Sequence, residues 1–143
     1  MKKYVVDASV TLKWIFEEED SKKARELLRM SERGKIMLLA PDLWTYEMIS
    51  AITTAVRRKK ITVAKAEEMM RMVMKAGLKL ISVNDIAERI VRISIKYDIS
   101  GYDAAYIGLA KANSLILVTA DEALVRKVDD MRIVSSLKDF RNF

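Results

Sequence analysis

Short apolar runs rich in Val, Ile and Leu alternate along the chain with longer segments whose apolar residues recur at helical spacing. Runs of this length and composition are typical of buried strands. We expect five strands, at residues 3–7, 36–40, 78–83, 115–119 and, with a weaker pattern, 132–135. Strands that alternate with helices predict a three-layer α/β/α fold, in which helices cover both faces of a mostly parallel sheet.

The segments between these strands have the spacing of amphipathic helices. Pro suits the first turn of a helix, so Pro41 is a natural starting point for one of them. We expect helices over residues 21–33, from after Pro41 to about residue 58, over 62–77, over 84–97 and over 101–112.

Two of the helical segments have an unusual composition. Residues 67–74, EEMMRMVM, are rich in Met. Their apolar stripe predicts core packing, with a groove for a partner's amphipathic helix as the alternative. The 101–112 segment is expected to pack closely against the sheet or across a dimer, because it carries a stripe of small residues: Gly101, Ala104, Ala105, Gly108 and Ala112.

The 143-residue chain contains no Cys and no His. Disulfides, thiolate nucleophiles, His-based triads and nearly all transition-metal sites are therefore excluded. Carboxylates, Lys, Tyr and the hydroxyls of Ser and Thr remain for chemistry. A bound metal would be a hard, oxygen-preferring ion such as Mg²⁺ or Mn²⁺.

Length, hydropathy and charge indicate how many domains the protein has, where it is located and what kind of partner it binds. A chain of 143 residues, 51% hydrophobic, is expected to form one domain over residues 1–143. No apolar run is long enough for a signal-peptide core or for the roughly 20 residues that span a bilayer. We therefore expect a cytoplasmic protein without a membrane anchor. The net charge of +6 favours a polyanionic partner such as nucleic acid.

Each of the four main strands runs into an acidic residue: Asp7, Asp42, Asp85 or Asp121. In a parallel α/β sheet, ligands bind beyond the carboxyl ends of the strands, where the crossover direction reverses. These acids are therefore candidate site residues. A helix also starts at each position, and Asp there caps free N–H groups, so capping is the alternative interpretation.

Two tetrapeptides have the form of a capping box. Residues 82–85, SVND, fit this pattern and make Asp85 structural. Residues 100–103, SGYD, fit it too, which leaves Asp103 ambiguous on local grounds.

The other two acids are more open to a functional role. In residues 119–122, TADE, Thr119 and Glu122 could form the capping box and leave Asp121 free. Asp7 could be an N-cap or a carboxylate at the end of a central strand. When each acid is judged by whether helix capping explains it, Asp121 and Asp7 are the strongest candidates for a functional role and Asp103 is the next. This criterion does not select Glu47.

Four ordered motifs resemble the PIN domain family. They are VVDAS (5–9), YEMIS (46–50), GYDAAYIGLA (101–110) and LVTADEAL (117–124). The set covers essentially the whole chain in the right order. Within that superfamily, the length and the YDAAY helix resemble VapC-type toxins of toxin–antitoxin pairs.

The resemblance implies a metal-dependent endoribonuclease with a five-stranded parallel sheet in the order 3-2-1-4-5. It also implies an RNA substrate, a cognate antitoxin and a homodimer. Ser50 stands where many relatives have Asn, three residues after the helix Glu, and can still donate a hydrogen bond. Carried over by motif, the catalytic and metal-binding acids are Asp7, Glu47, Asp103 and Asp121, with Ser9 and Thr119 as supporting hydroxyls.

Such a cluster of acids makes chemical sense as a metal cage. Carboxylates drawn into one pocket repel one another, which raises their pKa values, and a divalent cation relieves that repulsion. One or two Mg²⁺ or Mn²⁺ ions held by oxygen ligands can activate a water and orient a phosphodiester. No His or Cys is needed for this reaction.

An acidic pocket needs basic surroundings to receive phosphates. The candidate nucleic-acid contacts are Lys13, Arg57, Arg58, Lys111 and Arg126, and each could equally belong to an ordinary solvated surface. Binding through phosphates would weaken steeply with added salt.

Three other functions stay open. A PIN-domain nuclease could process RNA without any antitoxin, and a PIN-like module could bind RNA or protein without cleaving. A phosphatase of the haloacid-dehalogenase type could use Asp7 as nucleophile. That motif requires a second Asp two residues on, where this chain has Ser9, so it fits less well.

Overall fold

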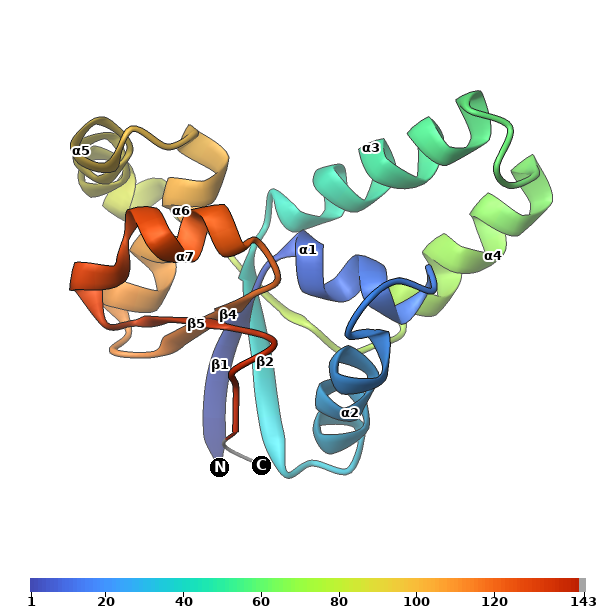
Figure 1. The fold of residues 1–143 in the computed structure, drawn as a ribbon, viewed down its shortest axis with the longest axis horizontal. Helices are drawn as coiled ribbons and strands as arrows, with labels where there is room; N and C mark the ends of the chain where they lie inside the picture. Colours follow the sequence, from blue (N-terminus) through green and yellow to red (C-terminus); the bar gives the residue numbers. More distant parts are fainter. Residues whose placement is uncertain (142–143) are drawn as a thin grey trace.

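The computed structural model describes residues 1–141, in which five parallel strands form one sheet (Figure 1). The strands are β1 (Lys2–Val6), β2 (Ile36–Pro41), β3 (Lys79–Ile81), β4 (Ile116–Thr119) and β5 (Val134–Ser136). Their order is β3-β2-β1-β4-β5, so β1 is central and the crossover direction reverses between β1 and β4. The predicted fold class is confirmed, together with the strand order that the family resemblance implied.

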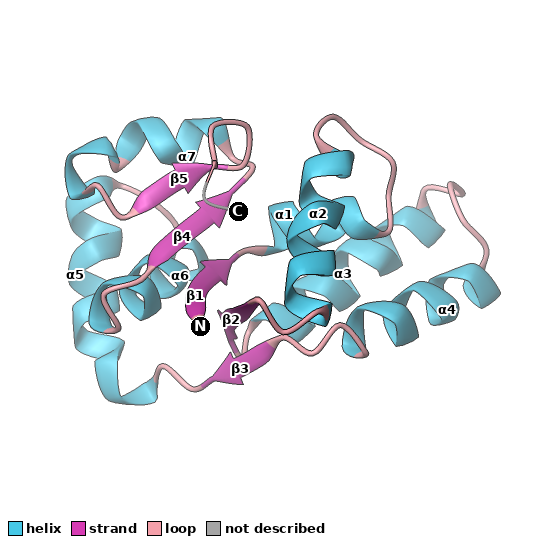
Figure 2. Cartoon of the chain, turned by 90° about the horizontal axis from the view of Figure 1, so that it is seen from below, coloured by secondary structure: helices cyan, strands magenta, loops and turns pink. Residues whose placement is uncertain are grey.

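Helices flank the sheet on both faces (Figure 2). They are α1 (Ala8–Thr11), α2 (Ser21–Glu32), α3 (Trp44–Arg57), α4 (Val63–Met74), α5 (Ala87–Tyr97), α6 (Gly101–Ala112) and α7 (Glu122–Lys127), with 3-10 turns η1 (Leu12–Trp14), η2 (Asn84–Ile86) and η3 (Asp129–Met131). Helix α6 packs directly on β1, β2 and β4, and α5 packs on α6. Helices α3 and α4 form a hairpin that extends away from the sheet (Figure 1). None of the helices in residues 1–141 is long and apolar enough to span a membrane.

The alternation of side chains along β1 builds two separate cores. Val5 belongs to the core on the α6 side, where it packs with Ala104, Ile107 and Leu117. Its neighbours Tyr4 and Val6 point to the other face, into the core that includes Leu27 of α2. Successive residues of a strand face opposite sides of the sheet, so a strand that is buried on both sides is apolar at consecutive positions.

Two local predictions about helix starts are wrong. Pro41 is the last residue of β2, and α3 begins three residues later at Trp44. The pairing of β2 with β1 ends at Leu39, so Pro41 lies where a missing N–H is tolerated. Residues 82–85 do not form a capping box either, because Ser82 accepts from the Asn84 N–H and a 3-10 turn follows.

The Met-rich helix α4 divides its methionines between the core and the surface. Met69 is buried, as the apolar stripe predicted. Met72 and Met74 are half exposed, at 53% and 50%. The helix therefore contributes to the core and also leaves apolar side chains exposed on the surface.

The small-residue stripe of α6 does pack closely, and Gly108 is its tightest point. A Cβ atom built on Gly108 would lie 2.9 Å from Cγ1 of Ile90 in α5. Glycine at this position therefore sets how near α5 can lie to α6.

Gly108→Ala is expected to lower the free energy of unfolding by about 1 to 2 kcal/mol, because overpacking of a tight contact outweighs the better helix propensity of Ala. Urea denaturation monitored by circular dichroism measures this. Gly101→Ala is the matched control in the same helix, because nothing lies within 4 Å of a Cβ there, and it should be neutral or stabilising.

A double-mutant cycle with Ile90→Ala identifies the contact. The double variant should lose less stability than the sum of the two single losses, because truncating Ile90 makes room for the new methyl group. Simple additivity would show that Gly108 matters for another reason.

Candidate active site

The first acid of the candidate site, Asp7, follows the central strand β1 and is only 6% exposed. Its Oδ1 accepts hydrogen bonds from Ser9 Oγ at 2.5 Å and from the Val10 N–H at 3.3 Å. Its Oδ2 accepts one from Thr119 Oγ1 at 2.5 Å. Asp7 therefore caps α1 and also presents a carboxylate at the switch point of the sheet, so both interpretations of this residue are correct.

Burial raises the pKa of Asp7 from its usual 3.8 to about 6. The hydrogen bonds from Ser9, Thr119 and Val10 act in the opposite direction, and the nearby charge of Asp103 adds to the rise. The hydroxyls therefore support an anion that the surrounding protein disfavours.

Thr119 and Ser9 connect the ends of β1 and β4. Besides donating to Asp7, Thr119 accepts from the Asp121 N–H at 3.1 Å. Ser9 accepts from the Ala120 N–H at 2.9 Å, and the two hydroxyl oxygens lie 3.3 Å apart. These hydroxyl groups fix the loop that carries Asp121 relative to Asp7.

The predicted capping box between Thr119 and Glu122 is wrong. Asp121 itself is the N-cap of α7, and its Oδ1 accepts from the Leu124 N–H at 3.1 Å. Thr119 does not cap the helix, because its hydroxyl donates to Asp7 and accepts from the Asp121 N–H instead. Asp121 is exposed, and its other carboxylate oxygen makes no hydrogen bond recorded among residues 1–141.

Glu47 lies in the first turn of α3 and reaches the site from a third element. The indole N–H of buried Trp44 donates to Thr11 Oγ1 at 3.0 Å, which anchors this end of α3 beside α1. Glu47 Oε1 accepts from the Tyr106 hydroxyl at 2.6 Å. Burial raises the pKa of Glu47, and the bond from Tyr106 partly offsets that rise.

Tyr106 is a site residue that the sequence did not reveal. It is 2% exposed, and burial together with Glu47 raises the pKa of its hydroxyl, which keeps it a hydrogen-bond donor. A buried Tyr in an apolar helix is usually interpreted as core. Its spacing of three residues from Asp103 could have indicated a role in the site, because this spacing places both side chains on one side of α6.

Asp103 is the acid that interacts with the other three. Its backbone N–H donates to Ser100 Oγ at 3.0 Å, so the predicted cap at the start of α6 is present. Burial, and then the charge of Asp121, raise the pKa of Asp103. The charge of Asp103 in turn raises the pKa of Asp7 and of Glu47.

The four acids are neighbours but do not form a ready-made ligand set. In the described part of the chain, no three acidic side chains lie close enough to hold a metal ion as they stand. Their donor chemistry still fits a hard cation, because all are carboxylates and three have raised pKa values in a shared site. Asp42 and Asp85 are exposed and are not among the charges that shift these pKa values.

A groove with a volume of about 850 Å³ opens beside Glu47, between α1, α3 and the start of α6. Ser50 lies on its wall one turn after Glu47. Two exposed aromatic rings, Tyr46 at 76% and Tyr102 at 64%, stand at its edges. The groove is large enough for an extended ligand next to the acids.

The predicted basic contacts are scattered around the molecule. Lys13 faces Glu18 at 3.9 Å, and Arg126 is exposed on α7. Arg57 and Arg58 lie about 15 Å from Glu47 along α3. Lys111 is at the other end of α6 from Asp103.

Carboxylates supported by hydroxyls at the switch point of a parallel sheet define an acidic α/β site suited to hard cations. The chain belongs to the PIN domain family, whose model matches residues 4–130. The family resemblance drawn from the four motifs is therefore confirmed.

Two relatives extend the comparison. The chain is 28% identical over 127 residues to a protein named Ribonuclease VapC3 from Pyrobaculum aerophilum, covering 87% of this chain and 94% of that one. The crystal structure of PAE2754, also from Pyrobaculum aerophilum, superposes with a TM-score of 0.72 at 23% identity. That superposition covers 96% of this chain and 92% of the other, and it supports the fold.

The raised pKa of Asp7 gives stability a definite pH dependence in metal-free buffer. Between pH 4 and pH 6 the unfolded chain has released this proton while the folded protein retains it, so stability falls as pH rises through this window. Asp7→Asn caps α1 comparably and cannot ionise. The stability difference between Asp7→Asn and the parent should therefore change by about 2 to 3 kcal/mol between pH 4 and pH 7, in favour of the variant.

Urea denaturation in EDTA at both pH values measures this difference. Asp42→Asn removes an exposed carboxylate at the end of β2 and is the matched control. Parallel pH profiles for the parent and Asp7→Asn would show that Asp7 does not retain its proton in the fold.

Proposed function

We propose that this protein is a metal-dependent endoribonuclease that cleaves phosphodiester bonds in RNA, built as a single domain over residues 1–143. The observation that carries the proposal is the buried Asp7 carboxylate, held by Ser9 and Thr119 at the end of the sheet, with the charge of Asp103 near enough to affect both Asp7 and Glu47. Membership of the PIN domain family and similarity to a protein named as a ribonuclease support it. The catalytic acids are Asp7, Glu47, Asp103 and Asp121.

The same four carboxylates are the proposed ligands of Mg²⁺ or Mn²⁺. When bound, such an ion supplies Lewis acidity for attack of water on a phosphodiester. Asp7 is held in place by Ser9 and Thr119, so its carboxylate is fixed before any ion arrives. Asp121 and Asp103 approach from the starts of two different helices, and binding a cation would offset the repulsion between them.

Tyr106 is proposed as a positioning residue for Glu47. Its hydroxyl donates to one carboxylate oxygen and leaves the other free to face the site. The same bond favours the ionised form of Glu47 against the effect of burial. Tyr106 thus acts on orientation and charge without touching the substrate.

The proposed RNA path starts at the groove beside Glu47 and continues over basic residues. Tyr46 and Tyr102 are exposed at the groove edges, where aromatic rings can stack on bases. Ser50 can donate a hydrogen bond on the groove wall. The proposed phosphate contacts are Lys13, Arg57, Arg58, Lys111 and Arg126.

We also propose that the protein is the toxin of a toxin–antitoxin pair and forms a homodimer in the cytoplasm. The name of the VapC3 relative supports this assignment. A second groove, of about 260 Å³, has an apolar lining from Trp14, Leu28 and Met72, and suits the apolar face of an antitoxin helix. Co-purification with the product of a neighbouring gene would distinguish a toxin from an RNA-processing nuclease without an antitoxin.

Asn at position 7, 103 or 121 is expected to leave the protein folded and to reduce Mg²⁺-dependent cleavage of single-stranded RNA at least about 100-fold. Asn caps a helix about as well as Asp but is a neutral, weaker ligand, and a lost metal contact of several kcal/mol corresponds to this loss of rate. Gel analysis of labelled RNA measures it, with Asp42→Asn as control. Three variants as active as the parent would refute the proposed site.

Tyr106→Phe is expected to weaken Mn²⁺ binding about 10-fold or more, because the supporting bond to Glu47 is lost. Isothermal titration calorimetry measures the affinity directly. The pH at which binding reaches half its maximum should also move upward, because Glu47 becomes harder to ionise. A change in thermal stability alone, with the Mn²⁺ affinity and its pH profile unaltered, would assign Tyr106 a purely structural role.

A further inference from the structure

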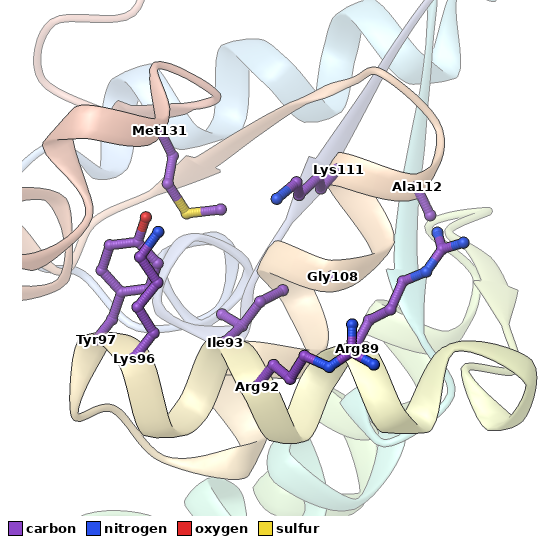
Figure 3. A pocket seen from close by; sticks show the side chains of 9 residues that line it. All are labelled: Arg89, Arg92, Ile93, Lys96, Tyr97, Gly108, Lys111, Ala112 and Met131. Carbon is purple, nitrogen blue, oxygen red and sulfur yellow. The ribbon is translucent and has the colours of Figure 1, made fainter.

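A third hollow, with a volume of about 390 Å³, lies between α5, α6 and η3 (Figure 3). We call it the α5–α6 groove. Its lining includes Ile93 and Met131 as apolar surface. Four cationic side chains surround it: Arg89, Arg92 and Lys96 from α5, and Lys111 from α6. The hollow therefore combines an apolar lining with a strongly basic rim.

The charges on this rim are not neutralised within the protein. In residues 1–141, none of the four cations forms an ion pair with an acidic side chain. Lys96 instead lies 5.3 Å from the centre of the Tyr97 ring, and the Tyr97 hydroxyl donates to Asp130. Because like charges on one helix face repel, a bound polyanion would relieve this repulsion.

The groove is physically linked to the acidic site. Lys111 and Asp103 belong to the same helix, about two turns or 12 Å apart. Lys127 lies between the two regions: its charge favours the ionised form of Asp103, and its ammonium group donates to the Asp98 carbonyl after α5 at 2.9 Å. A flexible polyanion that contacts the acidic site can therefore extend to the groove past Lys127.

We propose that the α5–α6 groove binds a single-stranded segment of the RNA substrate outside the bond that is cleaved. Arg89, Arg92 and Lys96 contact phosphates, and a base packs on the apolar lining beside Tyr97. The inference rests on the proposed ribonuclease function and adds a subsite to it.

The chemistry of the groove favours RNA over an acidic peptide. The planar fork of Arg matches the oxygens of a phosphate and also stacks on bases. Ile93, Met131 and the ring of Tyr97 provide an apolar surface that suits the face of a base. Glu and Asp side chains would satisfy the cations and leave this surface uncovered.

The test compares two triple variants that each remove three positive charges and so lower the net charge equally, by three. The groove variant is Arg89→Gln, Arg92→Gln and Lys96→Gln. The matched control is Arg29→Gln, Arg33→Gln and Lys35→Gln, exposed residues around the end of α2. All binding measurements use the Asp121→Asn background in EDTA and a fluorescein-labelled, unstructured 20-nucleotide RNA.

The groove variant should bind this RNA about 10-fold or more weakly at moderate salt, with a salt-dependence slope smaller by about 2, as expected for three lost phosphate contacts. The control should stay within about twofold of the parent. With Asp121 restored and Mg²⁺ present, the groove variant should cleave the 20-nucleotide RNA less efficiently. Cleavage of a dinucleotide, which is too short to reach the groove, should be unchanged.

Equal losses in the two triple variants would show an effect of net charge alone and overturn the inference. So would equal loss of affinity for a 20-residue polyglutamate peptide, which would identify a surface for acidic proteins. If the parent cleaves RNA and the groove variant matches it, only the subsite is wrong. If the parent neither binds nor cleaves RNA, the proposed function fails as well.

Discussion

Burial of the Asp7 carboxylate at the end of the central strand is the constraint around which the functional end of the molecule is organised. A buried anion is costly unless hydrogen bonds satisfy it. Ser9 and Thr119 supply those bonds, and in doing so they connect β1 to β4 across the point where the crossover direction reverses. The same two hydroxyls accept hydrogen bonds from backbone N–H groups of the loop after β4, which carries Asp121. The groups that hold Asp7 therefore also position Asp121.

The remaining acids reach this centre from helices that the core holds in position. Trp44 anchors the start of α3 through its bond to Thr11. Helix α6 lies against three strands through residues that are small or apolar and almost wholly buried, from Ala104 to Ala110. A site assembled from four separate segments is accurate only if their packing is rigid, and the close contact at Gly108 shows how little space is left.

The sequence predicted the architecture well because alternating strands and helices allow few arrangements. The ends of the strands were harder to predict. In β3, an edge strand of three residues, Lys79 is exposed, so the pattern of apolar residues does not show where the strand begins and ends. Asp7, Asp103 and Asp121 stand at strand ends or helix starts, where local rules could find them. Glu47 lies within a helix and came only from the family resemblance. The true role of Thr119 depended on the pairing of β1 with β4, which no local pattern contains.

Helix α6 carries an acid at its first turn and a basic residue at its last, and the core holds it along the length between them. A helix fixed in this way has a constant length and acts as a molecular ruler. If RNA is held at one end of α6 and cut at the other, the length of the helix would fix the distance between the bound segment and the bond that is cleaved. Fragment lengths would then be set by protein geometry as well as by base sequence.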